Sequence, residues 1–305
     1  CGRTRCGRRT RGERIAMAIT AAMVKELRER TGLGMMDCKA ALTEAGGDME
    51  LAIEELRKKS ALKAAKKAGR TTANGLIGIH IADDASRGVM VEVNIETDFA
   101  AKNEKFIAFV DKVTQAAFAA GGEDVAALMA GDLDAERERL VQEIGENMSV
   151  RRIASVGQGD GFVASYLHGD NRKAVLLELS GPEEELGRDL AMHVTAINPL
   201  VVAGSDVPAD VLAKEREIYI SQAEDSGKPA DIVEKMVEGR VRKYLAEVSL
   251  VEQPFVKDSN VKVGQLLADK NVTCRGFVRF EVGEGIEVAE EDFAAEVAAQ
   301  IQDSK

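Results

Sequence analysis

Aromatic residues are scarce in this 305-residue sequence, which has no tryptophan, three tyrosines and nine phenylalanines. Carbohydrate grooves and base-stacking platforms are built on aromatic faces, so the composition argues against both kinds of site. The first sixteen residues also lack the apolar run of a secretory signal or a membrane anchor. We therefore expect no membrane partner.

Cysteines are few and scattered. Cys1 and Cys6 lie near the start, and Cys38 and Cys274 stand singly in the rest of the chain. Without a CxxC pair or a Cys/His cluster, the sequence predicts neither a zinc site nor a disulfide framework. Together with the missing signal peptide, this pattern is typical of a reducing, cytoplasmic protein.

Motifs of catalysis are missing as well. There is no GxxxxGK[ST] phosphate loop, and the glycine-rich run at 157–161 opens a predicted strand instead of a helix. His80, His168 and His193 form no metal or triad motif, and His193 fits a core or surface position better than a ligand. We therefore predict no catalytic residue, no cofactor and no metal site.

Charge is unevenly distributed along the chain. Residues 1–16 hold six arginines and one glutamate, a net charge of +5, whereas the whole chain has −11, so the remainder has −16. A chain with this negative charge repels the phosphate backbone of nucleic acids, so we expect no direct nucleic-acid partner. We interpret 1–16 as a non-native or mis-annotated leader and expect the chain to start at Met17, in preference to a functional basic tail.

The helical and strand patterns predict an α+β fold in several parts. Residues 17–57 read as a bundle of three short helices, with Thr20 and Asp48 as N-caps. Residues 58–73 read as a basic linker helix, for which a solvated face is a better explanation than an RNA contact.

From residue 74 the apolar period changes to two, which indicates strands. A strand–strand–helix unit in 74–156 recurs in 157–207, which we join with 249–260 as a second, related core subdomain. The first strands of the two copies are 86 positions apart, and the helices, aligned at Phe106 and Leu186, are 80 apart. We expect residues 121–155 to be mainly helical.

The last parts of the chain are a hairpin and a C-terminal module. Residues 208–248 read as two antiparallel helices with an apolar seam, an antiparallel coiled coil turning at 226–229. Residues 261–305 read as a short helix, a strand at 276–282 and a final helix at 291–301.

One segment, 92–102, runs from a strand through a turn into a helix. Its simplest interpretation places Phe99 in the core, with Thr97 or Asp98 as a helix cap. The alternative is a protruding acid–aromatic pair in which Phe99 anchors a partner.

Two separated segments resemble the signatures of the bacterial elongation factor Ts family. The first is LRERTGLGMMDCKAAL at 27–42, and the second surrounds Thr97, Asp98 and Phe99. The resemblance extends from Met17 to near the C-terminus and includes 144–147, 236–240 and 280–285. It implies that the N-terminal bundle is similar to ubiquitin-associated domains.

The resemblance further implies a guanine-nucleotide exchange factor that binds the GDP-bound and nucleotide-free forms of elongation factor Tu, in a 1:1 or 2:2 complex. Such a protein displaces Mg²⁺ from the partner GTPase and promotes GDP release without chemistry of its own. The family's pattern assigns this displacement to Thr97, Asp98, Phe99 and Ala100. It assigns further GTPase contacts to the set Met35, Met36, Lys39 and His168, and to the C-terminal helix and the hairpin.

Two other functions remain open on the sequence alone. The chain could be a non-exchange helical adaptor that docks through its N-terminal bundle. It could also be a metal-assisted hydrolase that uses Glu96, Asp98 and His80.

Overall fold

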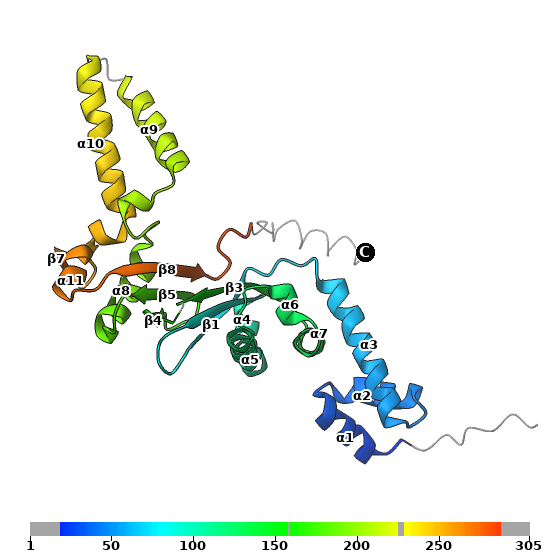
Figure 1. Cartoon of the computed structure of the whole chain (residues 1–305). Coiled ribbons are helices and arrows are strands. Elements are labelled where there is room, and N and C mark those ends of the chain that lie inside the picture. The colour runs from blue at the N-terminus through cyan, green and yellow to red at the C-terminus, as the bar shows by residue number, and fades with distance from the viewer. Residues whose placement is uncertain (1–18, 158, 225–228, 288–305) are drawn as a thin grey trace, which may run out of the picture. The chain divides into compact units, whose positions relative to one another are not determined.

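The computed structural model describes residues 19–157, 159–224 and 229–287, and within them the chain has an α+β fold (Figure 1). Its contacts divide it into two compact units. One comprises the residues up to 69 together with 134–146, and the other comprises 70–133 and the residues from 147 onward. None of the helices in the described ranges is long and apolar enough to cross a bilayer.

The N-terminal part of the first unit is a bundle of α1 (Ala21–Thr31), α2 (Met35–Glu44) and α3 (Met49–Lys67). Thr20 and Asp48 cap α1 and α3 by accepting the backbone N–H groups of Met23 and Leu51. The helices enclose a small apolar core of Val24, Leu27, Leu33, Cys38, Ala41, Leu42, Ala52 and Leu56.

The basic stretch after residue 57 continues α3 as far as Lys67. No glycine or proline interrupts the helix there, and one side of it is buried at Ser60 and Ala64. The Ser60 hydroxyl hydrogen-bonds the Gln142 side chain of α7 (Asp132–Ile144) at 2.5 Å. The bundle helix and the expected linker helix are therefore one element.

The second unit begins with a sheet of β1 (Asn74–Ile81), β2 (Gly88–Ile95) and β3 (Met148–Val156), all antiparallel, with β2 in the centre and wholly buried. Helix α5 (Glu104–Ala120) lies along one face of it (Figure 1). The short helix α4 (Asp98–Ala101) lies between β2 and α5 in the chain, and α6 (Val125–Met129) follows α5. The expectation that 121–155 are mainly helical holds for α6 and for 132–144, but it is wrong for 148–155, because this stretch carries β-branched residues that complete the sheet beside β2.

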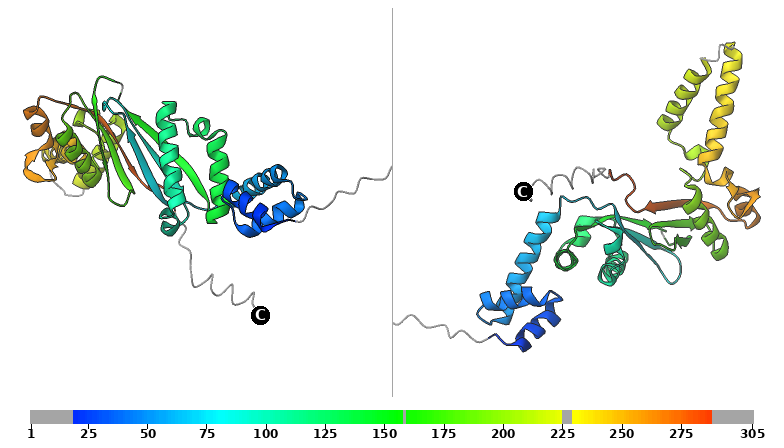
Figure 2. Two further views of the ribbon diagram at one scale, coloured as in Figure 1. Left: turned by 90° about the horizontal axis from the view of Figure 1, so that it is seen from below. Right: turned by 180° about the vertical axis from the view of Figure 1, so that it is seen from behind.

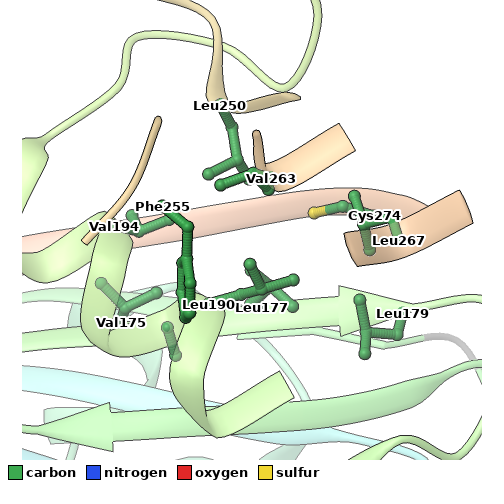
Figure 3. Close-up of a cluster of buried hydrophobic side chains, with 11 residues drawn as sticks. Val175, Leu177, Leu179, Leu190, Val194, Leu250, Phe255, Val263, Leu267 and Cys274 are labelled. Carbon is green, nitrogen blue, oxygen red and sulfur yellow. The ribbon is translucent and has the colours of Figure 1, made fainter. Parts of the chain in front are cut away.

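A second antiparallel sheet is formed by β4 (Phe162–Leu167), β5 (Lys173–Leu179) and β8 (Cys274–Glu281), and α8 (Glu184–Ile197) packs on it. β8 lies far along the chain, in the part predicted as a C-terminal module, yet it is the third strand here. Figure 3 shows how Phe255 of β6 (Pro254–Phe255) meets Leu190 and Val194 of α8 over this sheet. β7 (Asp258–Lys262) and α11 (Val263–Asp269) follow, and Val263 and Leu267 join the same core.

The β1–β2 and β4–β5 hairpins repeat each other at a spacing of 86 residues. Ile77 pairs with Glu92 and, 86 positions on, Val163 pairs with Glu178. The pairing with the third strand shifts register immediately after each of these glutamates. The hairpin turns repeat as well. The Ala82 N–H donates to the Arg87 carbonyl, and 86 positions on the His168 N–H donates to the Lys173 carbonyl.

The two hairpins also contact each other reciprocally. The Ile77 N–H donates to the Asn171 carbonyl at 2.8 Å, and the Val163 N–H donates to the Ala85 carbonyl at 2.7 Å. Both acceptor residues have a left-handed backbone, with φ of 55°. These equivalent bonds give the contact the form of a two-fold interface inside one chain.

The covering helices repeat at a different spacing. The buried positions of α5, namely 106, 109, 110, 113 and 114, match buried positions of α8 at a spacing of 81, one more than the sequence alignment gave. Thr114 and Thr195 correspond, and each hydroxyl donates to the carbonyl four residues earlier. The first copy therefore has five additional residues between its second strand and its helix.

Helices α9 (Ala209–Glu224) and α10 (Ala230–Val248) lie side by side as an antiparallel hairpin (Figures 1 and 2). Ala223, Val237 and Val241 are buried in its seam. Short 3₁₀ turns, η1 (Gly204–Asp206) and η2 (Leu250–Glu252), flank the hairpin. Residues 1–16, most of the predicted turn at 226–229 and the helix predicted at 291–301 lie outside the described residues.

Candidate partner-binding site

The turn after β2 presents Phe99 to solvent. Thr97 is the N-cap of α4, and its hydroxyl accepts the Ala100 N–H at 3.2 Å, as predicted for one of the two cap candidates. Ala100 and Ala101 are buried, with Ala100 8% exposed, whereas Phe99 is 81% exposed. Placing Phe99 in the core was therefore wrong: the two alanines anchor the turn, and the aromatic ring is left outside.

Charged groups flank the exposed ring. The Asp98 carboxylate pairs with the Lys102 ammonium at 3.1 Å, a spacing of four residues. The same ammonium lies 5.5 Å from the centre of the Phe99 ring. Both ion-pair partners are largely exposed, so the pair adds little stability but defines the charges around the ring.

The base of the turn is held by Glu96. Its carboxylate accepts the backbone N–H of Asn147 at 2.5 Å and lies 3.4 Å from the Arg70 guanidinium. The Asn147 side chain in turn donates to the Arg70 carbonyl at 3.0 Å. On the other side, the Asn74 amide donates to the Glu96 carbonyl at 2.9 Å.

His168 lies in the turn between β4 and β5. Its Nδ1 is 2.8 Å from an oxygen of Asp170, which also accepts the Arg172 N–H. Burial raises the pKa of Asp170, but the hydrogen bonds from His168 and Arg172 outweigh it, so the pKa of this carboxyl lies below its usual range. The ring is half-exposed and directs its other nitrogen, Nε2, away from Asp170.

Asn74 joins this turn to the Phe99 turn. Its amide nitrogen donates to the Glu96 carbonyl, and its amide oxygen accepts the Arg172 guanidinium at 3.0 Å. Asn74 also pairs with Ile95, the last residue of β2. The structure thus brings Thr97–Ala100 and His168 to the same end of the first sheet.

The internal repeat shows which features of this end the fold does not need. Ala82 occupies the position of His168 in the first hairpin, whose turn keeps the same backbone hydrogen bonds. The imidazole is therefore dispensable for the turn. α4 lies in the longer connection of the first copy, and the shorter connection of the second copy has no equivalent helix in the described residues, so the repeated strand–strand–helix unit forms without the Phe99 turn.

The residues of the hydrolase alternative do not meet. His80 is six residues along β1 from Asn74, about 20 Å at strand spacing, and its ring packs on Phe118 at 4.4 Å. Glu96 and Asp98 lie at the opposite end of the sheet. Throughout the ranges that the structure describes, no group of three His, Cys, Asp or Glu side chains could hold a metal ion.

A buried ion cluster that the sequence did not reveal is centred on Glu92, three residues before the end of β2. Glu92 of β2 is fully buried and contacts the guanidinium groups of Arg151 and Arg152 at 3.1 and 2.6 Å. It also accepts the Gly283 N–H and the Asn94 amide. Burial raises the pKa of Glu92, but the Gly283 hydrogen bond and the Arg152 charge outweigh it, and the net pKa is lowered.

The remaining predicted contact residues share the first turns of α2 in the first unit. Met35 and Met36 are 59% and 76% exposed, and Lys39 is exposed. The helix is oriented by the buried side chains of Leu33 and Cys38, which flank the two methionines in sequence. Two adjacent exposed methionines make an adaptable apolar surface.

His193 is a core residue, one of the two positions that the sequence left open. Its Nε2 lies 2.9 Å from the Gln253 oxygen, and its Nδ1 accepts the Val256 N–H at 3.1 Å. Burial lowers the pKa of this imidazole. Because both ring nitrogens serve the packing of α8 against β6, His193 has no part in the exposed site.

The fold and the site define an α+β protein that offers exposed apolar side chains on short, well-anchored turns. The model of the family described as "Elongation factor TS" matches residues 96–284. The chain is 57% identical over 289 residues to elongation factor Ts of Saccharophagus degradans, covering 95% of this chain and all of that protein. It is 58% identical over 285 residues to elongation factor Ts of Hahella chejuensis, covering 93% of this chain and 99% of that protein.

The chain therefore belongs to the elongation factor Ts family, a family of translation elongation factors. The resemblance seen in its two signature segments is confirmed. Its role lies in the elongation stage of protein biosynthesis.

Proposed function

We propose that this protein is a guanine-nucleotide exchange factor that binds the GDP-bound form of elongation factor Tu, displaces its Mg²⁺ and promotes the exchange of GDP for GTP. The observation that carries the proposal is the 81% exposure of Phe99 on a turn that is anchored by the Thr97 cap and two buried alanines. An aromatic side chain has only two rotatable torsions, so it loses little conformational entropy when a partner's pocket covers it.

The mechanism needs no bond-making residue in this chain. A factor that binds the nucleotide-free GTPase more tightly than the GDP-bound form must weaken GDP by the same ratio, because the two binding equilibria are linked. Phe99, beside Asp98 and supported by Thr97 and Ala100, would wedge into the partner near its Mg²⁺ ion. With that ion displaced, the GDP phosphates lose compensating charge and GDP leaves.

Further contacts would come from two places. His168 would reach the partner near the bound phosphates, and Met35, Met36 and Lys39 would form a separate apolar and basic contact on the GTPase domain. The dispensability of the imidazole for its own turn supports a binding role for His168.

The wider arrangement follows the family's pattern. We propose a ubiquitin-associated-like bundle, two related core subdomains and a coiled-coil hairpin, acting in the cytoplasm in a 1:1 or 2:2 complex with no direct nucleic-acid contact. The alternative, a helical adaptor that binds elongation factor Tu without exchange, predicts binding with no change in GDP release.

The test is release of a fluorescent GDP analogue from elongation factor Tu, measured by stopped flow over a range of factor concentrations. The wild-type chain should accelerate release, and Phe99→Ala should slow the accelerated rate by about 10- to 100-fold, the range of a central aromatic anchor. Leu62→Ala is the matched control, since Leu62 is 63% exposed on α3 of the other unit. Release by Phe99→Ala as fast as by wild type would refute the wedge.

A further inference from the structure

The two candidate contact elements of the second unit, the Phe99 turn and the His168 turn, come from different repeats and are 69 positions apart in sequence. The side chain of Asn74 contacts both. The Asn74 amide nitrogen donates to the Glu96 carbonyl at the base of the Phe99 turn, and its amide oxygen accepts Arg172, four residues after His168.

We propose that Asn74 is a positioning residue that couples the Phe99 turn to the His168 turn, so that both engage the partner together. This inference rests on the proposed exchange function. An amide is suited to the task because it carries a donor and an acceptor on one planar group. Each of its two ends is used on a different turn.

The backbone around Asn74 is closely packed, so a shift of one turn would be passed through the Asn74 side chain to the other turn. A Cβ on the next residue, Gly75, would lie 2.1 Å from the Val93 carbonyl oxygen, so the backbone approaches β2 closely there. The preceding residue, Ala73, is covered by Gly283, at which a Cβ would lie 2.3 Å from the Ala73 carbonyl oxygen. The Asn74 carbonyl accepts the buried Asn94 amide at 3.2 Å.

The Arg172 end is held in the same way. The Arg172 N–H donates to Asp170, the residue that also contacts the His168 ring. The Arg172 carbonyl accepts the N–H of Val282, the residue after β8, at 2.9 Å. A displacement of the Asn74 amide would therefore reach the turn that presents the imidazole.

The internal repeat supplies a matched control. Asp160 stands 86 positions after Asn74, in the equivalent place before β4, and its carboxylate pairs with Arg275 at 2.5 Å. Its partner Arg275 belongs to β8, which forms part of neither the Phe99 turn nor the His168 turn. Asp160→Ala therefore removes a side chain from the equivalent position without touching the coupling.

The experiment measures the maximal rate of GDP release from elongation factor Tu with the full-length chain. Asn74→Ala should lower the rate about tenfold, the effect of losing two hydrogen bonds, while Asp160→Ala stays within about twofold of wild type. Arg172→Met, which removes the bond to one turn only, should lower the rate about threefold. Asn74→Asp keeps an acceptor for Arg172 and should recover part of the loss.

A double-mutant cycle separates coupling from a general loss of structure. In the wild-type background, the combined effect of Phe99→Ala and His168→Ala should differ from the product of the single effects by about fivefold or more. In the Asn74→Ala background the two effects should multiply. Asn74→Ala should remain fully folded at the assay temperature, with its melting transition well above it.

Several results would overturn the proposal. One is a wild-type rate for both Asn74→Ala and Arg172→Met. Another is an unchanged interaction between Phe99 and His168 in the Asn74→Ala background. A third is a loss of rate in Asn74→Ala that is fully explained by unfolding of the variant at the assay temperature. If instead the wild-type chain fails to accelerate GDP release while still binding the GTPase, the exchange function itself fails.

Discussion

Replacing Glu92 with glutamine should destabilise the second unit strongly, because Glu92 is a fully buried charge with two arginine partners. Glutamine retains the shape but removes the counter-charge of Arg151, and it leaves Arg152 with only the half-exposed Glu284 carboxylate at 3.3 Å. Removing one partner of a buried ion pair costs about 3–5 kcal/mol. Since the two arginine side chains are 28% and 30% exposed and can be partly solvated, we expect a loss of about 2–4 kcal/mol.

The effect should depend on pH in a defined direction. The pKa of Glu92 is lower in the folded protein than the ordinary value of 4.5, so the unfolded chain binds more protons in acid. Its contribution is fully present above pH 4.5 and is lost as the pH falls through the folded-state pKa. The stability of the wild type should therefore fall more steeply below pH 4.5 than that of Glu92→Gln.

Urea unfolding followed by far-ultraviolet circular dichroism measures both effects. The control is Glu178→Gln, at the equivalent position of the second hairpin, where the side chain is 13% exposed and pairs with the Arg275 guanidinium at 3.1 Å. We expect this variant to lose about 1 kcal/mol or less. Equal losses for the two variants, or parallel pH profiles for Glu92→Gln and wild type, would refute the assigned role of the buried cluster.

Two further perturbations test the packing. Gly75→Ala should lower the free energy of unfolding by about 2–4 kcal/mol, because the φ of Gly75 is +145° and the new Cβ would meet the Val93 carbonyl. Gly276→Ala, with open space around the Cβ, should lower it by about 1 kcal/mol or less in the same urea assay. His193 has a lowered pKa in the fold, so the unfolded state binds its proton first and stability should decline as the pH falls below 6.5, by at most about 1.4 kcal/mol per pH unit. Thermal unfolding of His193→Gln should lack this decline; a decline of the same size there would assign it to another group.

The helices and the hairpin strands were predictable because their signals are local. Thr20 and Asp48 cap helices whose apolar residues recur at helical spacing, and the alternating residues of β1 mark a half-buried strand. β3 was missed because its sequence, MSVRRIASV, places two arginines together, and only the buried Glu92 on the neighbouring strand explains them. β8 was predicted as a strand, but its pairing with β5 joins segments about a hundred residues apart, which no local pattern specifies.

The candidate site divides in the same way. The signature around Phe99 could be found from the sequence, but its exposure could not, since an aromatic residue in a strand-to-helix junction is more simply placed in a core. The decisive fact is that Ala100 and Ala101 fill the space beneath the turn. The role of Asn74 was invisible, because its partners, Glu96 and Arg172, are far from one another in the chain.

The reciprocal contact between the two hairpins has an evolutionary consequence. In a dimer of identical subunits, every substitution at such an interface is made twice, and both copies must tolerate it. When the same two-fold contact is closed within a single chain, each half can change alone. Alanine at position 82 and histidine at position 168 are one such difference: one half has a plain turn, and the other carries a side chain that the turn itself does not require.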